Sequence, residues 1–149
     1  MSRVMVLFAT LAAICFGAAS QAAEPLALRC DMRSEPGRFV APTIFVGVQP
    51  EKRTAVVSDI VILHFDKKPA TGRVITFNDR RLRVSWEVRN IKDSRQTPVA
   101  RMDFSLSLNR KTRKVEVFAR PVGYPNTFSA RGTCTPVNAK QVQELLKSS

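Results

Sequence analysis

The chain of 149 residues is poor in the residue types on which most enzymes and metal sites depend. It has one histidine, one tryptophan, one tyrosine, three cysteines and six glycines. The sequence contains no CxxC pair, no glycine-rich phosphate loop and no GxSxG motif. We therefore assign no catalytic residue, no metal ligand and no cofactor to the chain, and we favour a non-enzymatic role.

The one histidine, His64, lies two positions before Asp66 in an apolar run. In a strand the two side chains would share a face, and such a pair can orient a general base when a nucleophile lies close by. The sequence does not place Ser58 or Ser85 as that nucleophile. A structural histidine at the end of a strand is the favoured interpretation.

Acidic residues are scarce relative to basic ones. The sequence has 12 acidic and 24 basic residues, with a formal net charge of +12. Sixteen of the basic residues are arginine, whose planar guanidinium group suits phosphate and carboxylate recognition better than the lysine ammonium group. A surface of this charge attracts anions, among them lipid head groups, acidic glycans and nucleic acids.

Only the N-terminus carries an apolar run that approaches the length of a membrane span. One positive charge at Arg3, the apolar segment 4–19 and small residues at Ser20 and Ala22 are typical of a secretory signal peptide. The segment is shorter than the roughly 20 residues that a span needs. We expect a signal peptide at 1–22, whose cleavage removes Cys15 and leaves a single domain at 23–149 with a net charge near +11. The mature protein would be periplasmic or secreted; a retained N-terminal anchor is the alternative.

Two cysteines remain after that cleavage, Cys30 and Cys134. In an oxidising compartment a disulfide is the default state, and two thiols allow one connectivity. The bond would span 104 positions, for which the chain-entropy model gives roughly 4–5 kcal/mol. We therefore predict a disulfide that ties the two ends of the domain together.

Helical periodicity is nearly absent from the rest of the chain, where apolar residues recur at every second position. This alternation predicts β-strands with one face toward a core and one toward solvent. The segments that show it are 26–32, 81–89, 101–108, 114–120 and 128–134, and the apolar runs 43–48, 55–65 and 73–77 between turns also predict strands. They predict an all-β fold, an antiparallel β-barrel or β-sandwich of about seven to eight strands. A short C-terminal helix could begin at Asn138, which is a suitable N-cap.

The alternation also assigns individual side chains to the two faces of the strands. Trp86, Phe104 and Phe128 fall on the inward face, whereas Phe118 falls on the outward face. Both bridging cysteines fall inward, so the disulfide would join the first and last strands, where the edges of a sheet most need protection. Because most large rings point inward, stacking platforms for bases are scarce, and nucleic-acid binding is disfavoured.

An anion-binding surface is the leading functional hypothesis. The segment 81–89 alternates apolar and polar residues and presents Arg81, Arg83 and Arg89 on its outward face. The densest basic cluster lies at a predicted hairpin turn and consists of Arg110, Lys111, Arg113 and Lys114. Together these residues would bind an anionic glycan or lipid head group of the cell envelope. Basic turns are also commonly solvated without any ligand, which is the alternative for the turn cluster.

Two other classes of function remain open. An exported inhibitor or partner-binding module, for example one that acts on a protease, could dock through the loop 90–98 or the N-terminal arm. Periplasmic inhibitors of lysozymes and metalloproteases are also small disulfide-linked β-domains, although lysozymes are commonly basic and two basic surfaces repel. A small ligand could instead lie inside a barrel, but an interior of this size is usually filled by side chains. Its lining would be Leu82, Trp86, Phe104 and Phe128.

Three stretches carry a resemblance to known sequences. They are GYPNTFSARGTC at 123–134, LSLNRKTRKVEV at 106–117 and LRC at 28–30. Through them the chain resembles small uncharacterised exported β-proteins of Gram-negative bacteria that carry a cysteine near each end. Those proteins usually have glycine at the turn position that Arg113 occupies here. The resemblance implies a periplasmic or secreted β-domain and implies no activity.

Overall fold

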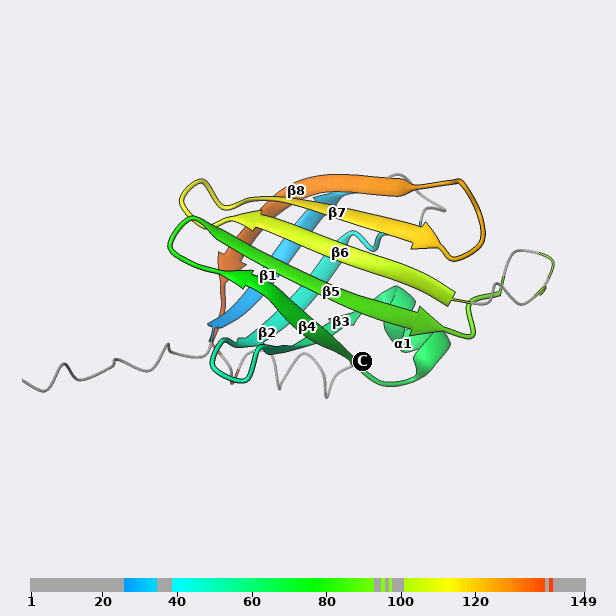
Figure 1. Ribbon diagram of the computed structural model, residues 1–149, viewed down its shortest axis with the longest axis horizontal. Helices are drawn as coiled ribbons and strands as arrows, with labels where there is room; N and C mark the ends of the chain where they lie inside the picture. The colour runs from blue at the N-terminus through cyan, green and yellow to red at the C-terminus, as the bar shows by residue number, and fades with distance from the viewer. Residues whose placement is uncertain are drawn as a thin grey trace, which may run out of the picture.

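Eight antiparallel strands form a closed barrel with one short helix at its rim (Figure 1). The computed structural model describes residues 26–34, 39–92, 95, 97, 101–138 and 140. The elements are β1 Leu26–Arg33, β2 Thr43–Gln49, β3 Thr54–Asp59, α1 Ile60–Asp66, β4 Ala70–Phe77, β5 Arg81–Arg89, β6 Arg101–Asn109, β7 Lys114–Pro121 and β8 Phe128–Pro136. Each strand pairs with the next along the chain, and β8 pairs with β1. The predicted all-β fold is confirmed, and of the two predicted architectures it is the barrel.

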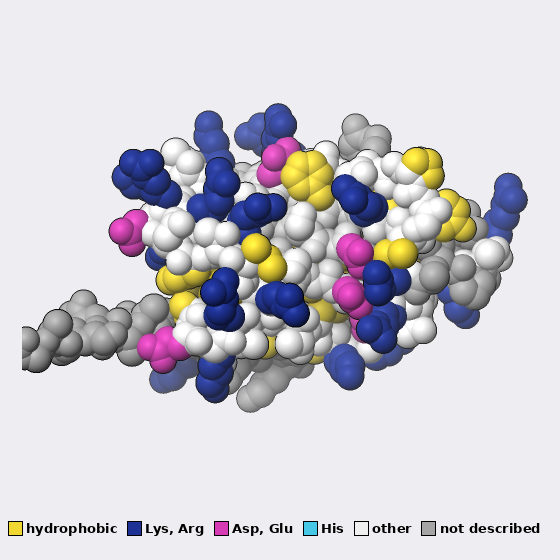
Figure 2. Space-filling view, viewed as in Figure 1, with side chains coloured by type: hydrophobic (Ala, Val, Ile, Leu, Met, Phe, Trp, Pro, Cys, Tyr) yellow, Lys and Arg dark blue, Asp and Glu magenta, His cyan; other side chains and the backbone are white. Residues whose placement is uncertain are grey.

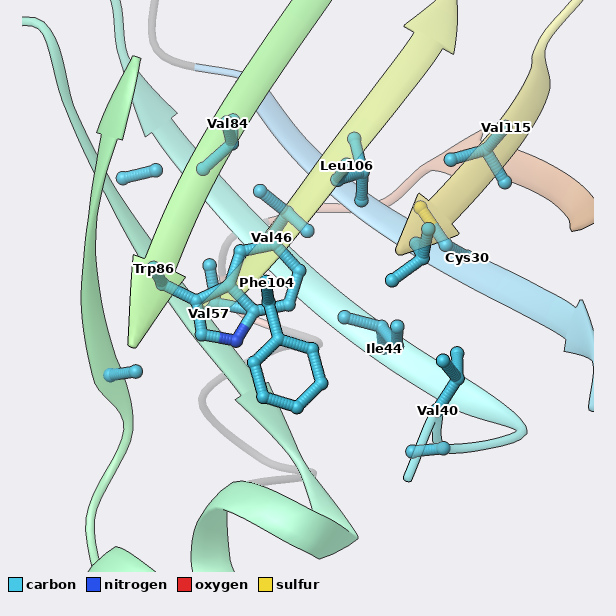
Figure 3. Packing of buried hydrophobic residues seen from close by; sticks show 14 of the residues in the cluster. Cys30, Val40, Ile44, Val46, Val57, Val84, Trp86, Phe104, Leu106 and Val115 are labelled. Atoms are coloured by element: carbon cyan, nitrogen blue, oxygen red, sulfur yellow. The ribbon is translucent and has the colours of Figure 1, made fainter. Parts of the chain in front are cut away.

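The barrel interior is filled by the protein's own side chains. Burial alternates along the strands, as their period of two requires, and Leu82 of β5 is completely buried. Trp86 and Phe104 stack with their ring centroids 5.3 Å apart (Figure 3). Phe128 is half-buried and packs edge-to-face on Phe39. The residues that would line an interior ligand site therefore belong to one packed cluster.

The first and last strands are joined by a covalent bond as well as by the sheet. Cys30 of β1 lies directly opposite Cys134 of β8, and the two form the predicted disulfide. Both side chains are buried, which confirms their inward orientation. Two positions away, Met32 lies opposite Gly132, where an added Cβ would be 2.1 Å from the backbone oxygen of Asp31. We call this close β1–β8 junction the seam.

The predicted strand 55–65 is wrong in its second half. β3 ends at Asp59, and the residues that follow form α1. Asp59 caps the helix, because its backbone is extended and its Oδ1 accepts a hydrogen bond from Ile62 N at 2.8 Å. The run Ile60–Asp66 is apolar on nearly all sides, so it carries no helical period to distinguish it from a buried strand.

The helix also removes the predicted pairing of His64 with Asp66. Residues two apart on a helix do not face each other, so these side chains share no common face. His64 is exposed and contacts the ring of Phe65 edge-to-face. Asp66 accepts hydrogen bonds from the backbone N–H of Arg89 at 3.3 and 3.4 Å. The predicted histidine at the end of a strand is therefore corrected to an exposed histidine on α1.

Burial makes Asp59 a source of pH-dependent stability. Desolvation raises the pKa of its carboxyl group from 3.8 to about 6, although hydrogen bonds from the N–H groups of Ile62 and Val61 act to lower it. The folded state therefore binds this proton more tightly than the unfolded state does. The stability that protonation contributes is present below about pH 4 and is lost as the pH rises through the folded pKa near 6.

The variant Asp59→Asn keeps an acceptor for the helix cap and carries no charge. We expect it to raise the free energy of unfolding at pH 8 by about 2–3 kcal/mol, because the cost of burying the carboxylate disappears. At pH 4 the native carboxyl group is already protonated, so the gain should vanish there. Urea denaturation at the two pH values checks this result. An equal gain at both would contradict the assigned titration.

Several predicted features lie wholly or mostly outside the described residues. These are the signal peptide at 1–22, the loop 90–98 apart from 90–92, 95 and 97, and the C-terminal helix apart from its start. Asn138, the predicted N-cap of that helix, accepts a hydrogen bond from Lys140 N at 3.1 Å. Within the described ranges, no helix combines the length and the apolarity that crossing a membrane requires.

Candidate anion-binding site

The sheet register places five outward side chains in one row across the strands. From β5 to β7 the row contains Arg83, Ser107 and Glu116. It continues with Arg131 on β8 and crosses the seam to Arg33 on β1. Basic residues therefore stand at both ends of the row, with shorter polar and acidic residues between them.

A groove of about 630 Å³ follows this row on the outer surface of the barrel. Its basic side chains come from β1, β5, β7 and β8, which lie far apart in the sequence and are brought together by the barrel. We call it the basic groove. Its charged lining residues are Arg33, Arg81, Lys114, Arg131, Asp31 and Glu116.

Both acidic residues that line the basic groove form ion pairs with arginine. Asp31 pairs with Arg29 at 3.1 Å, and Glu116 pairs with Arg131 at 2.9 Å. The lining bases for which the described part of the chain provides no ion pair are Arg33, Arg81 and Lys114. The groove therefore carries positive charge that the acidic side chains of the described residues do not neutralise, and such charge attracts an external anion.

Arg33 and Arg131 form a like-charged pair across the seam. The two residues are directly opposite in register, where Cβ atoms lie about 5 Å apart. Like charges in this position destabilise a sheet, and Glu116 relieves Arg131 alone. An anion held between the two guanidinium groups would remove the repulsion.

A second outer groove extends the basic surface around β5. It has a volume of about 580 Å³ and shares Arg81 with the basic groove. Its charged lining residues are Asp79, Arg80, Arg81, Arg83 and Lys111. The two adjoining grooves thus bring together four of the predicted anion-binding residues, namely Arg81, Arg83, Lys111 and Lys114.

Arg110 and Arg113, two further predicted residues, have structural roles in the turns and line neither groove. The guanidinium group of Arg110 lies over the Phe77 ring, 4.4 Å from its centroid, and donates a hydrogen bond to the backbone oxygen of Asn78. Arg110 thereby fastens the β6–β7 turn to the β4–β5 turn. Arg113 has a φ of 59°, a left-handed conformation that glycine adopts at lower cost.

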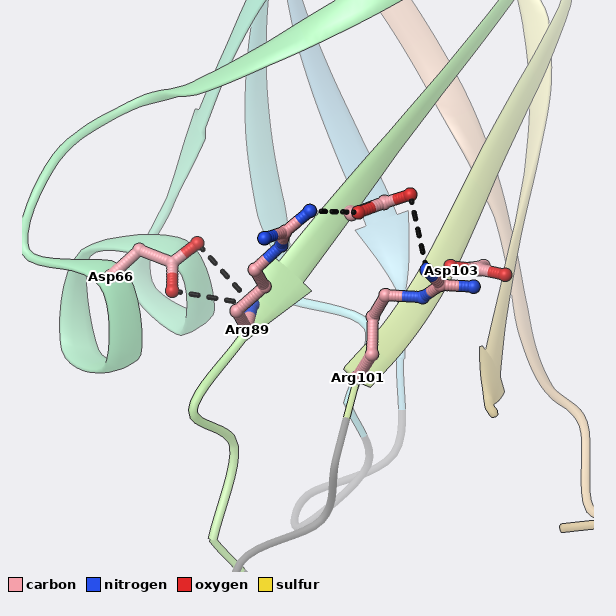
Figure 4. Close-up of polar contacts among 5 residues, drawn as sticks. Asp66, Arg89, Arg101 and Asp103 are labelled. Atoms are coloured by element: carbon pink, nitrogen blue, oxygen red, sulfur yellow. Dashed lines mark hydrogen bonds and ion pairs between the residues drawn. The ribbon is translucent and has the colours of Figure 1, made fainter. Parts of the chain in front are cut away.

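Arg89, the last predicted residue, lies at the opposite end of β5 in a different group of charges (Figure 4). It pairs with Glu87 at 3.1 Å, and Arg101 pairs with Glu87 at 3.7 Å and with Asp103 at 3.1 Å. We call Asp66, Glu87, Arg89, Arg101 and Asp103 the acid-paired cluster. Because its charges alternate in sign, its attraction for an external anion largely cancels.

The space-filling view shows basic side chains over the whole face formed by β5–β8, with acidic side chains among them at both ends (Figure 2). Lys and Arg side chains crowd the end that carries the β4–β5 and β6–β7 turns (Figure 2). Toward the end that carries α1, acidic side chains lie among the basic ones (Figure 2). Phe118 is 38% exposed on this outer face, which confirms its predicted outward orientation.

Arg33 and Arg131 are not among the predicted site residues, although a signal for them exists. Arg33 follows Cys30 by three positions, and Arg131 precedes Cys134 by three. In antiparallel strands such positions face one another when the cysteines are directly opposite, as they are here. The two arginines could therefore have been found by assuming that the disulfide joins opposed residues.

The described residues include no group of three or more His, Cys, Asp or Glu side chains that could hold a metal ion. No protein-family model, curated protein or solved structure matches this chain. Its function is therefore argued from the geometry and charge of the two grooves.

Proposed function

We propose that this protein is a non-enzymatic exported β-barrel domain that binds an anionic component of the cell envelope, a glycan or a lipid head group, through the basic groove. The proposal is carried by the charge of the groove: among the described residues, Arg33, Arg81 and Lys114 have no ion pair with an acidic side chain, and Arg33 lies opposite Arg131. That opposition costs stability, which a bound anion would restore. Because the groove is open to solvent, its affinity should fall as salt rises.

Nucleic acid fits this surface less well than a glycan or a head group does. Proteins that bind single strands stack successive bases on aromatic rings. Phe118 is the large aromatic side chain exposed on the described strands, and it lines neither groove. The grooves therefore offer charge and hydrogen-bonding groups without a stacking platform.

A protein partner is the second candidate, and exposed apolar side chains favour it. Ile60 on α1 is 70% exposed, and Tyr124 in the β7–β8 connection is 57% exposed. Both residues lie at the barrel end opposite the basic turns. An inhibitor or partner-binding module, such as one acting on a protease, would bury these side chains. Co-purification of one dominant partner at high salt, abolished by Ile60→Ser, would favour this candidate over anion binding.

The anion-binding proposal is tested by removing three arginines from the two grooves. We expect the triple variant Arg33→Ser, Arg81→Ser and Arg83→Ser to bind heparin at least about 100-fold more weakly at low salt, because each charged contact contributes about 1 kcal/mol. Its affinity should also depend less steeply on salt than that of the wild type. Affinity measured over a series of salt concentrations gives both quantities.

The matched control removes three arginines from the other end of the same face. Arg89 and Arg101 belong to the acid-paired cluster, and Arg120 lies opposite Asp103. Replacing all three with serine removes the same net charge, and we expect a loss of heparin affinity below about fivefold because Glu87 and Asp103 lie beside these arginines. Equal losses in the two triple variants would mean that net charge, and not the basic groove, binds the anion.

A further inference from the structure

The arginines of the basic surface stand in two pairs on either side of a polar floor. Arg81 and Arg83 project from the same face of β5. Arg33 and Arg131 face one another on β1 and β8. From Arg83 to Arg131 the register crosses three strand spacings, or about 14 Å at about 4.8 Å each. A ligand with two anionic groups at about this separation would contact both pairs.

The floor between the two arginine pairs carries polar side chains beside Val115 and Glu116. Ser107, Asn109 and Thr133 line the basic groove and present hydroxyl and amide groups. The side-chain oxygen of Asn109 accepts hydrogen bonds from Lys111 N and Thr112 N, so its amide N–H groups are the part directed to a ligand. These groups match the hydroxyls of a sugar ring.

The large hydrophobic residues that are exposed in the described part of the chain all lie outside the basic groove. They are Val56, Ile60, Ile75, Phe118 and Tyr124. The groove's volume of about 630 Å³ lies within the range of sites for ligands of disaccharide size. The groove would therefore contact the head group of a lipid and leave the chains outside.

We infer that the basic groove, together with Arg83 of the adjoining second groove, binds an acidic saccharide that carries two anionic groups, one on each arginine pair, with its sugar rings over the floor of Ser107, Asn109 and Thr133. This inference rests on the proposed function and names its ligand class. The β5 pair holds one anion, and the pair across the seam holds the other. Lys114 lies between them and adds charge to the middle of the site.

Calorimetric titration with three probes tests the inference. The probes are a glucosamine disaccharide with one phosphate on each sugar, the same disaccharide with a single phosphate, and inorganic phosphate. We expect the bisphosphorylated sugar to bind at least about 30-fold more tightly than the monophosphorylated one, because the second contact forms within a bound ligand. Equal affinities for the two sugars would overturn the inference.

Paired variants locate the two anionic groups. The double variants Arg81→Ser with Arg83→Ser, and Arg33→Ser with Arg131→Ser, should each lower the preference for the bisphosphorylated sugar to less than about threefold. Arg89 and Arg101 are also directly opposite in register but belong to the acid-paired cluster, so replacing both with serine should leave the preference intact. A preference that survives in either groove variant would contradict the two-pair geometry.

Heparin binding and the affinities for the two sugars together show whether the saccharide assignment fails alone or anion binding by the groove fails as well. If heparin binding depends on the groove arginines but the two sugars bind equally, the anion-binding proposal stands and the two-anion saccharide does not. If the groove variants bind heparin as the wild type does, both fail. An RNA oligonucleotide that binds more tightly than the bisphosphorylated sugar would overturn the saccharide assignment.

A competition experiment distinguishes the two sources of such a saccharide. Vesicles whose lipid head group is the bisphosphorylated disaccharide are added to the protein together with the soluble sugar. Competition by the vesicles assigns the ligand to a membrane surface. Binding of the soluble sugar that vesicles do not displace assigns it to a free glycan. Binding of the vesicles alone, without any of the soluble sugar, would overturn recognition of the saccharide.

Discussion

A variant with alanine at both Cys30 and Cys134 is expected to have a free energy of unfolding about 4–5 kcal/mol below that of the wild type. The disulfide spans 104 positions, and its loss returns conformational entropy to the unfolded chain. Both residues are buried, so alanine places no new polar group in the core. A loss of this size approaches the whole stability of a small domain, so the variant should be partly unfolded under native conditions.

Urea denaturation of the wild type and the double variant measures this loss. The wild type in dithiothreitol is the control, because it lacks the crosslink and keeps both cysteine side chains. We expect the reduced wild type to lose most of the same free energy. A loss below about 1 kcal/mol in both would show that strand pairing and packing close the barrel without the covalent bond.

Gly132→Ala is expected to destabilise the barrel by at least about 3 kcal/mol, although it adds one methyl group to a strand. The added Cβ would lie 2.1 Å from the backbone oxygen of Asp31 and 2.9 Å from its carbonyl carbon. Both atoms are backbone atoms of β1 and cannot rotate away as a side chain can. β1 and β8 would therefore have to separate next to the disulfide.

Gly47→Ala is the matched control for this substitution. Gly47 lies in β2, and the nearest atom to an added Cβ is the backbone oxygen of Val56 at 4.0 Å. Alanine there should change stability by less than about 1 kcal/mol, in the stabilising direction, because it restricts the unfolded chain. Thermal unfolding of the two variants gives the comparison. Similar melting temperatures for both would show that the seam tolerates extra volume.

The seam links the stability of the barrel to the candidate site. Arg33 and Arg131 face one another because β1 and β8 pair in the register that also aligns the two cysteines. A seam that opens at Gly132 would separate the two arginines. We therefore expect Gly132→Ala to weaken heparin binding even where the protein remains folded, whereas Gly47→Ala should bind as the wild type does.

The strands could be predicted from the sequence because each has one buried face. In β5 the inward residues Leu82, Trp86 and Val88 are all buried, and a shift of one position would expose every one of them. The same alternation predicted that both cysteine side chains point into the barrel. Alternation alone does not distinguish a barrel from a sandwich, because that choice depends on whether the first and last strands pair.

α1 could not be predicted from the same signal. Ile62 is buried, and Val61 and Phe65 pack against the core from the rim of the barrel. The exposed side of α1 carries the apolar Ile60, so the sequence lacks the polar face of an amphipathic helix. Asp59 is the N-cap at which the helix begins. Because it directly follows the residues of a strand, the sequence pattern does not mark it as the start of a helix.

The candidate site was predictable in part. The alternation of side chains along a strand shows which face of the sheet each one occupies, but it does not show which residues of other strands lie beside it. Arg81, Arg83 and Arg89 share one face of β5, yet Arg89 stands eight residues beyond Arg81, or about 26 Å along the strand. The part played by Arg110 depends on Phe77 in another turn. Arg33 completes the site through the β1–β8 register, which can be inferred from the sequence only by assuming that Cys30 and Cys134 lie directly opposite one another.

Titration of the ¹⁵N-labelled protein with the bisphosphorylated disaccharide, followed by backbone amide chemical shifts, tests most directly whether one surface of the barrel binds the anion. We expect the largest shift changes at Arg33, Arg81, Lys114 and Arg131, which come together across four strands, with little change at Arg89. Changes centred on the acid-paired cluster, or spread evenly over the basic residues of the whole surface, would contradict the assignment of the basic groove.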